Sequence, residues 1–158
     1  MEIWIIGGLF VLLMFVVSTK IKKAAAAAYE REEVVRPTYS IVKPQGIIIP
    51  AAEISDTGFE GVSKDFGDNE TTESLRKLTV SLKQIESLNT DSQPHSQSTA
   101  VPSISEEVID HVTTKIVTMT LSVVSGLSWQ LRIVVPELHW DEMSPKVSEL
   151  TGSFRIKQ

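Results

Sequence analysis

The sequence predicts an α+β protein, in which an N-terminal transmembrane helix continues into a short stalk and then into a small soluble domain of antiparallel strands, arranged as hairpins, with one or two packed helices. Three observations predict this. Residues 3–17 form a nearly unbroken apolar run that three lysines follow, residues 114–135 alternate between apolar and polar side chains, and residues 75–85 repeat apolar side chains at helical spacing. We expect a transmembrane helix at 1–19, a basic and alanine-rich juxtamembrane stalk helix at 20–36, and the domain at 37–158 with a flexible linker at 89–104.

The apolar run is long enough to span a bilayer, because about nineteen helical residues at about 1.5 Å each approach the roughly 30 Å of a hydrocarbon core. Its one acidic side chain, Glu2, precedes the run, whereas Lys20, Lys22 and Lys23 follow it. A cleavable signal peptide has the opposite order, with positive charge first, so we expect an uncleaved signal-anchor. Trp4 is placed as an interfacial anchor near the other end of the span.

Basic side chains lie on one side of the predicted span only: Lys20, Lys22, Lys23, Arg31 and Arg36. By the positive-inside rule, the N-terminus lies outside and the domain in the cytoplasm. The glycosylation triplet at residues 69–71 argues for the opposite side, but such triplets are frequent by chance. We therefore expect a single-pass membrane protein whose first partner is the lipid bilayer.

The predicted helix gives no clear indication of a helical partner. Gly7 and Gly8 are adjacent and lack the GxxxG spacing at which two membrane helices pack closely. The five alanines that follow the lysines favour helix and predict that it continues to about residue 34. Alanine suits a plain spacer as well as a packing surface, so Ala24, Ala28 and Tyr29 are candidate partner-binding residues.

The first part of the domain contains a predicted hairpin. Residues 38–42 and 47–49 are rich in β-branched side chains and flank a turn with Pro44 and Gly46, at the positions that a type I turn prefers. Residues 58–69 combine helical spacing with three glycines, so the pattern favours neither structure.

Residues 71–88 fit two patterns. Helical spacing relates Leu75, Leu78, Leu82 and Ile85. A strand is the alternative, because Leu78, Val80 and Leu82 alternate with polar residues. The helix accounts for more apolar positions, so we predict a helix that lies on a sheet.

The C-terminal part carries the clearest strands. Residues 89–103 are polar and include two prolines, which predicts a linker. We then expect a short helix at 105–112 that Ser105 caps, a strand at 114–124, its hairpin partner at 129–136, and a final strand at 154–156.

Composition excludes several classes of site. The chain has a net charge of −5 and no cysteine. Nucleic acid is not an expected partner, because phosphate binding needs clustered Lys and Arg. The missing thiols exclude disulfides and thiolate metal sites. No glycine-rich nucleotide loop occurs, so no cofactor is predicted.

The three histidines are the remaining candidates for chemistry. His95 lies in the predicted linker, and His111 lies on the predicted short helix. His139 and Asp141 would project on the same side of an extended segment and could share a divalent metal, but no third ligand is identifiable. These two residues are weak metal candidates, and we predict no catalytic residue.

These observations predict a membrane-anchored accessory or assembly subunit, a non-enzymatic interaction module that contacts other subunits of a membrane complex. Two alternatives remain open from the sequence. One is a membrane-tethered metal-dependent hydrolase centred on His139 and Asp141, and the other is a domain that binds a small apolar ligand or lipid between its sheet and a helix.

Overall fold

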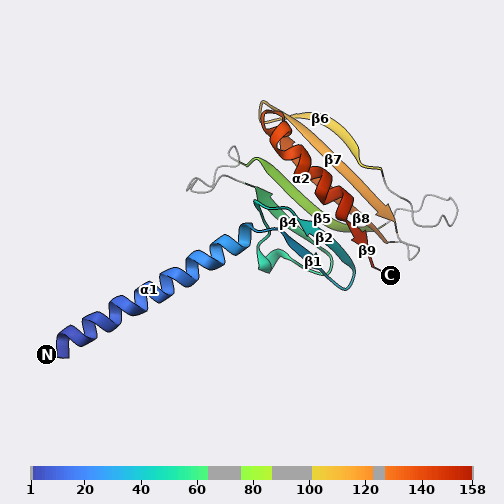
Figure 1. Cartoon of the computed structure of the whole chain (residues 1–158). Coiled ribbons are helices and arrows are strands. Elements are labelled where there is room, and N and C mark those ends of the chain that lie inside the picture. The colour runs from blue at the N-terminus through green and yellow to red at the C-terminus, as the bar shows by residue number, and fades with distance from the viewer. Residues whose placement is uncertain (1, 64–75, 87–100, 123–126, 158) are drawn as a thin grey trace.

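The computed structural model describes residues 2–63, 76–86, 101–122 and 127–157, with the side chains of the N-terminal helix described from Gly8 onward. A long helix projects from a domain of two antiparallel sheets and one packed helix (Figure 1). The predicted α+β class with antiparallel strands is therefore confirmed.

The N-terminal helix, α1, runs from Glu2 to Tyr29. The prediction that this helix continues to residue 34 is wrong, because the next residues form strand β1 (Glu32–Val35), which pairs with β2. Val34 is buried in the domain core from this strand. The burial of Val34 and the ladder hydrogen bonds therefore outweigh the helix propensity of the preceding alanines.

The larger sheet has six strands in the spatial order β3-β4-β5-β8-β7-β6, and every neighbouring pair is antiparallel. Its strands are β3 (Ile47–Ile48), β4 (Gly58–Ser63), β5 (Leu78–Glu86), β6 (Ser103–Ile109), β7 (Val112–Ser122) and β8 (Leu127–Pro136). The predicted pairing of the strands that became β7 and β8 is confirmed. The undecided stretch that begins at Gly58 forms β4 as far as Ser63.

The smaller sheet has the order β1-β2-β9, with β2 at Tyr39–Lys43 and β9 at Arg155–Ile156. The final strand is confirmed, but the predicted hairpin is wrong, because β2 and β3 belong to different sheets. The turn between them does form, and the Ile47 amide donates to the Pro44 carbonyl across 3.3 Å. It carries the chain from one sheet to the other instead of folding it back.

Two predicted helices are strands. The helix expected at 71–88 is β5 over its described part, and Leu78, Val80 and Leu82 are all fully buried. The helix expected at 105–112 is β6 followed by a two-residue turn at Asp110 and His111. In the first case the alternation of apolar and polar residues, and not the helical spacing, matches the structure, because a central strand buries every second side chain. Most of the predicted linker lies outside the described residues, and its end belongs to β6.

Helix α2 (Trp140–Ser153) follows the short 3₁₀ helices η1 (Ala51–Glu53) and η3 (Glu137–His139) along the chain. It lies on one face of the large sheet, where it contacts β7 and β8, and it also contacts β2 of the small sheet (Figure 1). The sequence patterns above did not predict this helix, although Met143, Val147 and Leu150 lie one helical turn apart and are buried. The core also contains Tyr39, Ile41, Ile47, Phe59, Leu78, Val80, Leu82, Val117, Met119, Trp129, Leu131, Ile133, Val135 and Phe154.

Candidate functional site

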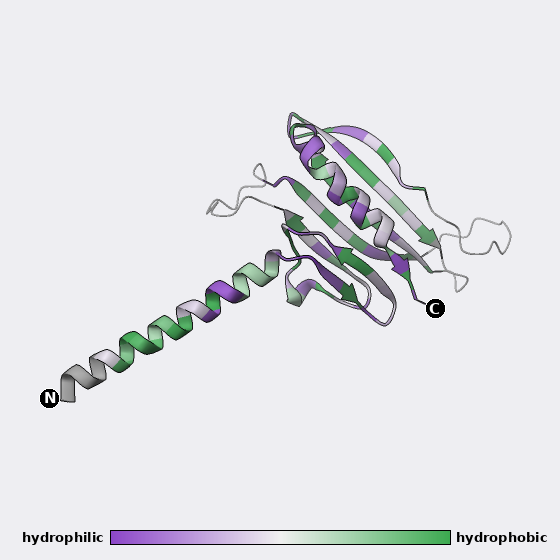
Figure 2. Ribbon diagram, viewed as in Figure 1, coloured by the Kyte–Doolittle hydropathy of each residue, from purple (hydrophilic) through white to green (hydrophobic). Residues whose placement is uncertain are grey.

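The most unusual surface of the described chain is the apolar length of α1. Every large apolar side chain from Leu9 to Val17 is exposed, with exposed fractions between 42% for Val16 and 70% for Leu9. These residues are consecutive, so they cover every side of the helix, as the green length of α1 in Figure 2 shows. A helix that is apolar all round is normally buried on all sides.

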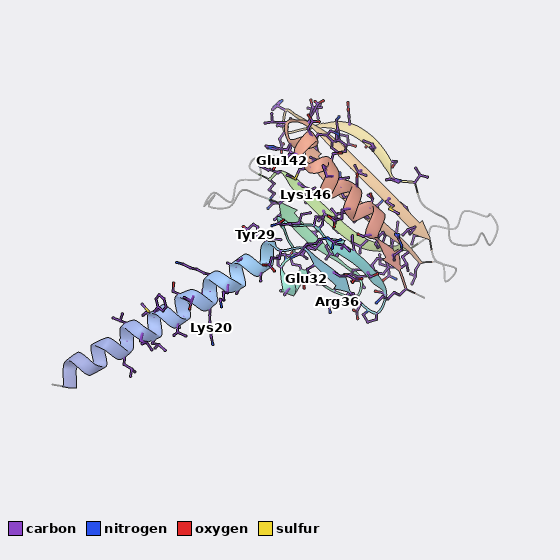
Figure 3. All side chains as sticks on the ribbon, viewed as in Figure 1. Lys20, Tyr29, Glu32, Arg36, Glu142 and Lys146 are labelled. Carbon is purple, nitrogen blue, oxygen red and sulfur yellow. The ribbon has the colours of Figure 1, made fainter. Side chains whose placement is uncertain are left out.

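The polar groups at the end of this apolar length are internally satisfied or charged. The Thr19 hydroxyl donates to the carbonyls of its own helix at Phe15 and Val16, at 3.0 and 2.9 Å. Lys20 follows at once (Figure 3), and Lys22 and Lys23 come within the next turn; all three are exposed. The change from apolar to cationic surface is therefore abrupt.

Among the residues that the structure describes, no helix reaches the length and apolarity needed to cross a membrane. The side chains of Trp4 and Gly7 lie outside the described set. At Gly8, a Cβ would meet no atom within 4 Å. Within the described chain, therefore, nothing packs against the helix at this glycine.

The base of α1 is fixed to the domain by a buried lysine. Lys43 of β2 is 3% exposed, and its Nζ donates to the Ala28 carbonyl at 2.9 Å. The same Nζ lies 3.4 Å from Oε2 of Glu32 in β1. The last carbonyls of a helix lack partners within the helix and carry partial negative charge, so an ammonium group satisfies both their hydrogen bonding and the helix dipole.

The turn between β2 and β3 provides the second attachment. The Gly46 amide donates to the Tyr29 carbonyl at 2.8 Å. Gly46 has φ of +87°, which disfavours residues with a Cβ, and a Cβ there would lie 2.9 Å from Nζ of Lys146 on α2. The backbone conformation therefore favours glycine at this contact, whereas the Lys146 side chain could move aside for a Cβ.

Helix α2 provides the third attachment, because Glu149 pairs with Nε of Arg31, just beyond the end of α1. Figure 3 shows Tyr29 and Glu32 where α1 meets the domain, and Lys146 on α2. Strand β2, the β2–β3 turn and α2 thus hold one helix end. We call Ala28, Tyr29, Lys43 and Gly46 the helix base.

The helix base changes the expectation for the alanine-rich stalk. The carbonyls of Ala28 and Tyr29 bind this domain, and both residues are partly buried. Ala24 is exposed. The sequence contained the turn residues Pro44 and Gly46 but no signal that the Gly46 amide binds α1, because this hydrogen bond forms only in the tertiary structure.

The weak metal candidates are not in an extended segment. His139 ends η3, and Asp141 lies in the first turn of α2. Trp140 between them packs partly on the core, with Nζ of Lys115 5.1 Å from its ring centre. Within the described ranges, no three His, Cys, Asp or Glu side chains gather as metal ligands. His95 lies outside these ranges, and His111 is in the β6–β7 turn.

A shallow hollow of about 300 Å³ opens beside Gly58, where Glu53, Glu60 and Lys83 line its edge. Glu60 and Lys83 pair with each other at 3.0 Å. Between α2 and the sheet, by contrast, Met143, Leu150 and Leu131 are at most 1% exposed. The space proposed for an apolar ligand is thus filled by the protein's own side chains at these positions.

The pKa of Tyr39 is shifted inside the core. Burial raises the pKa of the Tyr39 phenol, Arg36 lowers it by a smaller amount, and Asp56 raises it. The phenol donates to the Ser55 carbonyl at 3.0 Å and its ring lies 5.2 Å from that of Trp129. This tyrosine therefore links the small sheet to the turn that precedes β4.

Comparisons with known proteins identify the fold and no family. No protein-family model matches the chain, and no curated protein matches it. The yeast Ran-binding protein Mog1p has a similar structure, with a TM-score of 0.55 and 14% identity over 81% of this chain and 96% of Mog1p. A Bacteroides thetaiotaomicron crystal structure matches with a TM-score of 0.51 and 8% identity over 80% of this chain, which spans about half (48%) of that protein.

Proposed function

We propose that the chain is a single-pass, membrane-anchored accessory or assembly subunit, a non-enzymatic interaction module held at a membrane surface. One observation carries the proposal: α1 exposes apolar side chains in all directions and the described chain covers none of them from Leu9 to Val17. Water is a poor solvent for such a surface, because each buried apolar side chain is worth about 1.5–3 kcal/mol.

A bilayer fits this surface better than a single protein partner does. Lipid surrounds a helix on every side, whereas one packed partner covers one stripe. The described side chains begin at Gly8, but the sequence continues the apolar run back to Ile3 without a charged residue. The proposal relies on this full run, from residue 3 to 19, rather than on the described part alone.

The helix base supports a positional role for the domain. Strand β2 and the β2–β3 turn bind carbonyls at the end of α1, and α2 binds Arg31 just beyond it. Insertion of the helix would therefore fix the height and the orientation of both sheets relative to the bilayer. Confinement to a surface raises the effective concentration of a module toward partners on the same surface. Lys20, Lys22 and Lys23 favour a cytoplasmic domain with the N-terminus outside.

The proposed partners are other protein subunits of a membrane complex. Mog1p, which has a similar fold, is a Ran-binding protein, so a domain of this fold can serve in protein binding. The described residues offer no gathered metal ligands that would favour the hydrolase alternative.

Flotation with phosphatidylcholine vesicles tests the anchor. The full chain should float with the vesicles, and Leu12→Lys should shift it toward the dense fractions, because lysine at the centre of a spanning helix costs about 2.5–3.5 kcal/mol. Ala26→Lys is the matched control, since Ala26 is exposed on the same helix beyond the apolar run. A wild-type chain that stays in the dense fractions without detergent overturns the proposal.

Labelling of intact cells tests the orientation. The chain has no cysteine, so Lys157→Cys introduces a single thiol at an exposed position of the domain away from β6. A membrane-impermeant thiol reagent should label it only after the cells are opened. Labelling of intact cells would place the domain outside.

A further inference from the structure

Strand β6 forms an open edge of the large sheet. Within the described chain it pairs with β7 alone, and all seven of its residues are exposed. In an antiparallel pair, every second residue directs its amide and carbonyl away from the neighbouring strand. These backbone groups can pair with a further strand.

The edge also presents apolar side chains. Ile104 and Val108 are 60% and 71% exposed. Ile104 is opposite Val117, a core residue, so its side chain projects on the sheet face that carries α2. Val108 is four residues further along the strand and therefore projects on the same face. An added strand would cover the two exposed apolar groups and extend that face.

The charge on this edge indicates which kind of strand fits. Glu106 and Glu107 lie on β6, Asp110 lies in the turn beyond it, and the strand has no basic residue. The described cation nearest to them in the pairing is Lys115 of β7, whose Nζ lies 3.7 Å from Glu106. Glu107 is opposite Thr114 and so projects on the face away from Ile104 and Val108. A strand that alternates apolar and basic residues can therefore cover the two apolar groups with one face and place a cation beside Glu107 with the other, because opposite charges on paired strands stabilise a sheet.

A second copy of this chain fits poorly. Antiparallel pairing of two complete β6 strands is centred on Glu106, so the two Glu106 carboxylates would be directly opposite each other. Like charges in that position are destabilising, and natural edges use charges to prevent self-pairing.

The turn between β6 and β7 keeps β6 in an extended conformation. Asp110 and His111 both have positive φ, 48° and 66°, and connect Ile109 to its partner Val112 in a two-residue turn. That turn type matches the twist of the flanking strands and fixes their register. β6 is therefore extended before any partner arrives.

We propose that β6 is the partner-binding edge, and that it takes an extended segment of another protein in which apolar and basic residues alternate. This inference rests on the proposed function, for which it supplies the protein-binding surface. The edge lies five strand spacings from β3, or about 24 Å at about 4.8 Å each. The helix base, beside β3, therefore leaves it unobstructed.

Backbone hydrogen exchange on the full chain in detergent micelles tests the edge, with a synthetic peptide of alternating valine and lysine as the probe. The peptide should slow exchange of the β6 amides. A peptide with glutamate in place of lysine should bind at least about tenfold more weakly. A valine and lysine peptide with N-methylated backbone amides should give no protection, because it cannot pair as a strand.

Two variants localise the effect. Val108→Lys should weaken binding of the valine and lysine peptide by about tenfold or more, and Ile104→Lys serves as a second disruption of the same edge. Val35→Lys is the matched control, because Val35 is 52% exposed on β1, the edge strand of the other sheet. All three side chains are exposed, so thermal melting should show unchanged folding.

Three results overturn the proposal: no protection of β6 by the valine and lysine peptide, equal protection by the glutamate peptide, or a dimer of the chain joined through β6. Each leaves vesicle flotation unaffected. Failure of the docking edge and failure of the membrane anchor are therefore distinguishable.

Discussion

The two edges of the large sheet are built in opposite ways. At one edge, β3 is two residues long, Ile47 is fully buried and the end of α1 contacts the strand. At the other, β6 is seven residues long and exposed throughout. Short strands and covering helices are common protections for a sheet edge. The first edge is thus covered by the end of α1, and the second is open among the described residues.

The two edges of the large sheet therefore present different groups. Beside the closed edge, the Lys43 side chain and the Gly46 amide bind the last carbonyls of α1. The open edge carries acidic side chains and exposed apolar groups. If α1 lies in a membrane, the anchor and the proposed partner-binding edge are at opposite edges of one sheet.

The largest contrast between the edges should be in stability. Ile47→Ala should lower the free energy of unfolding by about 2–5 kcal/mol, the range for a large apolar side chain removed from a core. Ile104→Ala, the same change at the open edge, should alter it by less than about 0.5 kcal/mol. Urea denaturation of both variants in the same detergent measures the difference, and equal losses would show that the edges do not differ.

Lys43→Ala should give the next largest loss of stability, at the end of α1 beside the closed edge. It removes a buried donor from the Ala28 carbonyl, and an unsatisfied buried polar group costs about 1–3 kcal/mol. Hydrogen exchange should accelerate at the helix base, while β6 stays unchanged. Lys157→Ala is the control, because Lys157 is exposed just after β9, which pairs with the end of β2 away from Lys43. Equal effects of the two changes would contradict the role of Lys43.

Gly46→Ala tests the turn attachment. The positive φ should cost about 1–2 kcal/mol, the penalty for left-handed backbone in a residue with a Cβ. Gly152→Ala has no atom within 4 Å of the new methyl group and lies in α2, so it should be neutral or slightly stabilising. Thermal unfolding of the pair gives the comparison, and a Gly46 variant as stable as the Gly152 variant would remove this turn from the helix base.

The smallest effect should be that of Tyr39→Phe, at about 1 kcal/mol for the lost hydrogen bond to Ser55. It also has a pH signature. Because the folded-state pKa of Tyr39 is raised, its contribution is fully present below the unfolded pKa of about 10 and is lost as the pH rises through the folded pKa. The wild type should therefore lose stability more steeply than the variant above about pH 10. Parallel pH profiles would show that Tyr39 does not titrate differently on folding.

Local patterns predicted some strands and failed for others. Alternation in β7 and β8 gave their pairing, because Val117, Leu131 and Ile133 reflect burial of one sheet face. The same rule applied to β5, but Leu75 and Ile85 completed a helical spacing that outweighed it. β6 has no buried face, so its sequence carries no burial signal.

The site was only partly predictable. The apolar run and its lysines are contiguous, so the sequence alone identified them. The helix base depends on Lys43, which reaches Ala28 only after β2 has paired with β1. Such contacts arise from tertiary structure and leave no periodic trace in the chain.

The proposed role of α1 requires that lipid surrounds the helix on every side. Because the chain has no cysteine, single cysteines at residues 9–17 can each carry a nitroxide label in reconstituted vesicles. We predict high accessibility to oxygen and low accessibility to a polar relaxation reagent at every one of these positions. A repeat of about 3.6 residues in either quantity would indicate a helix covered on one face, and free access of the polar reagent throughout would place α1 in water; either result contradicts the membrane anchor.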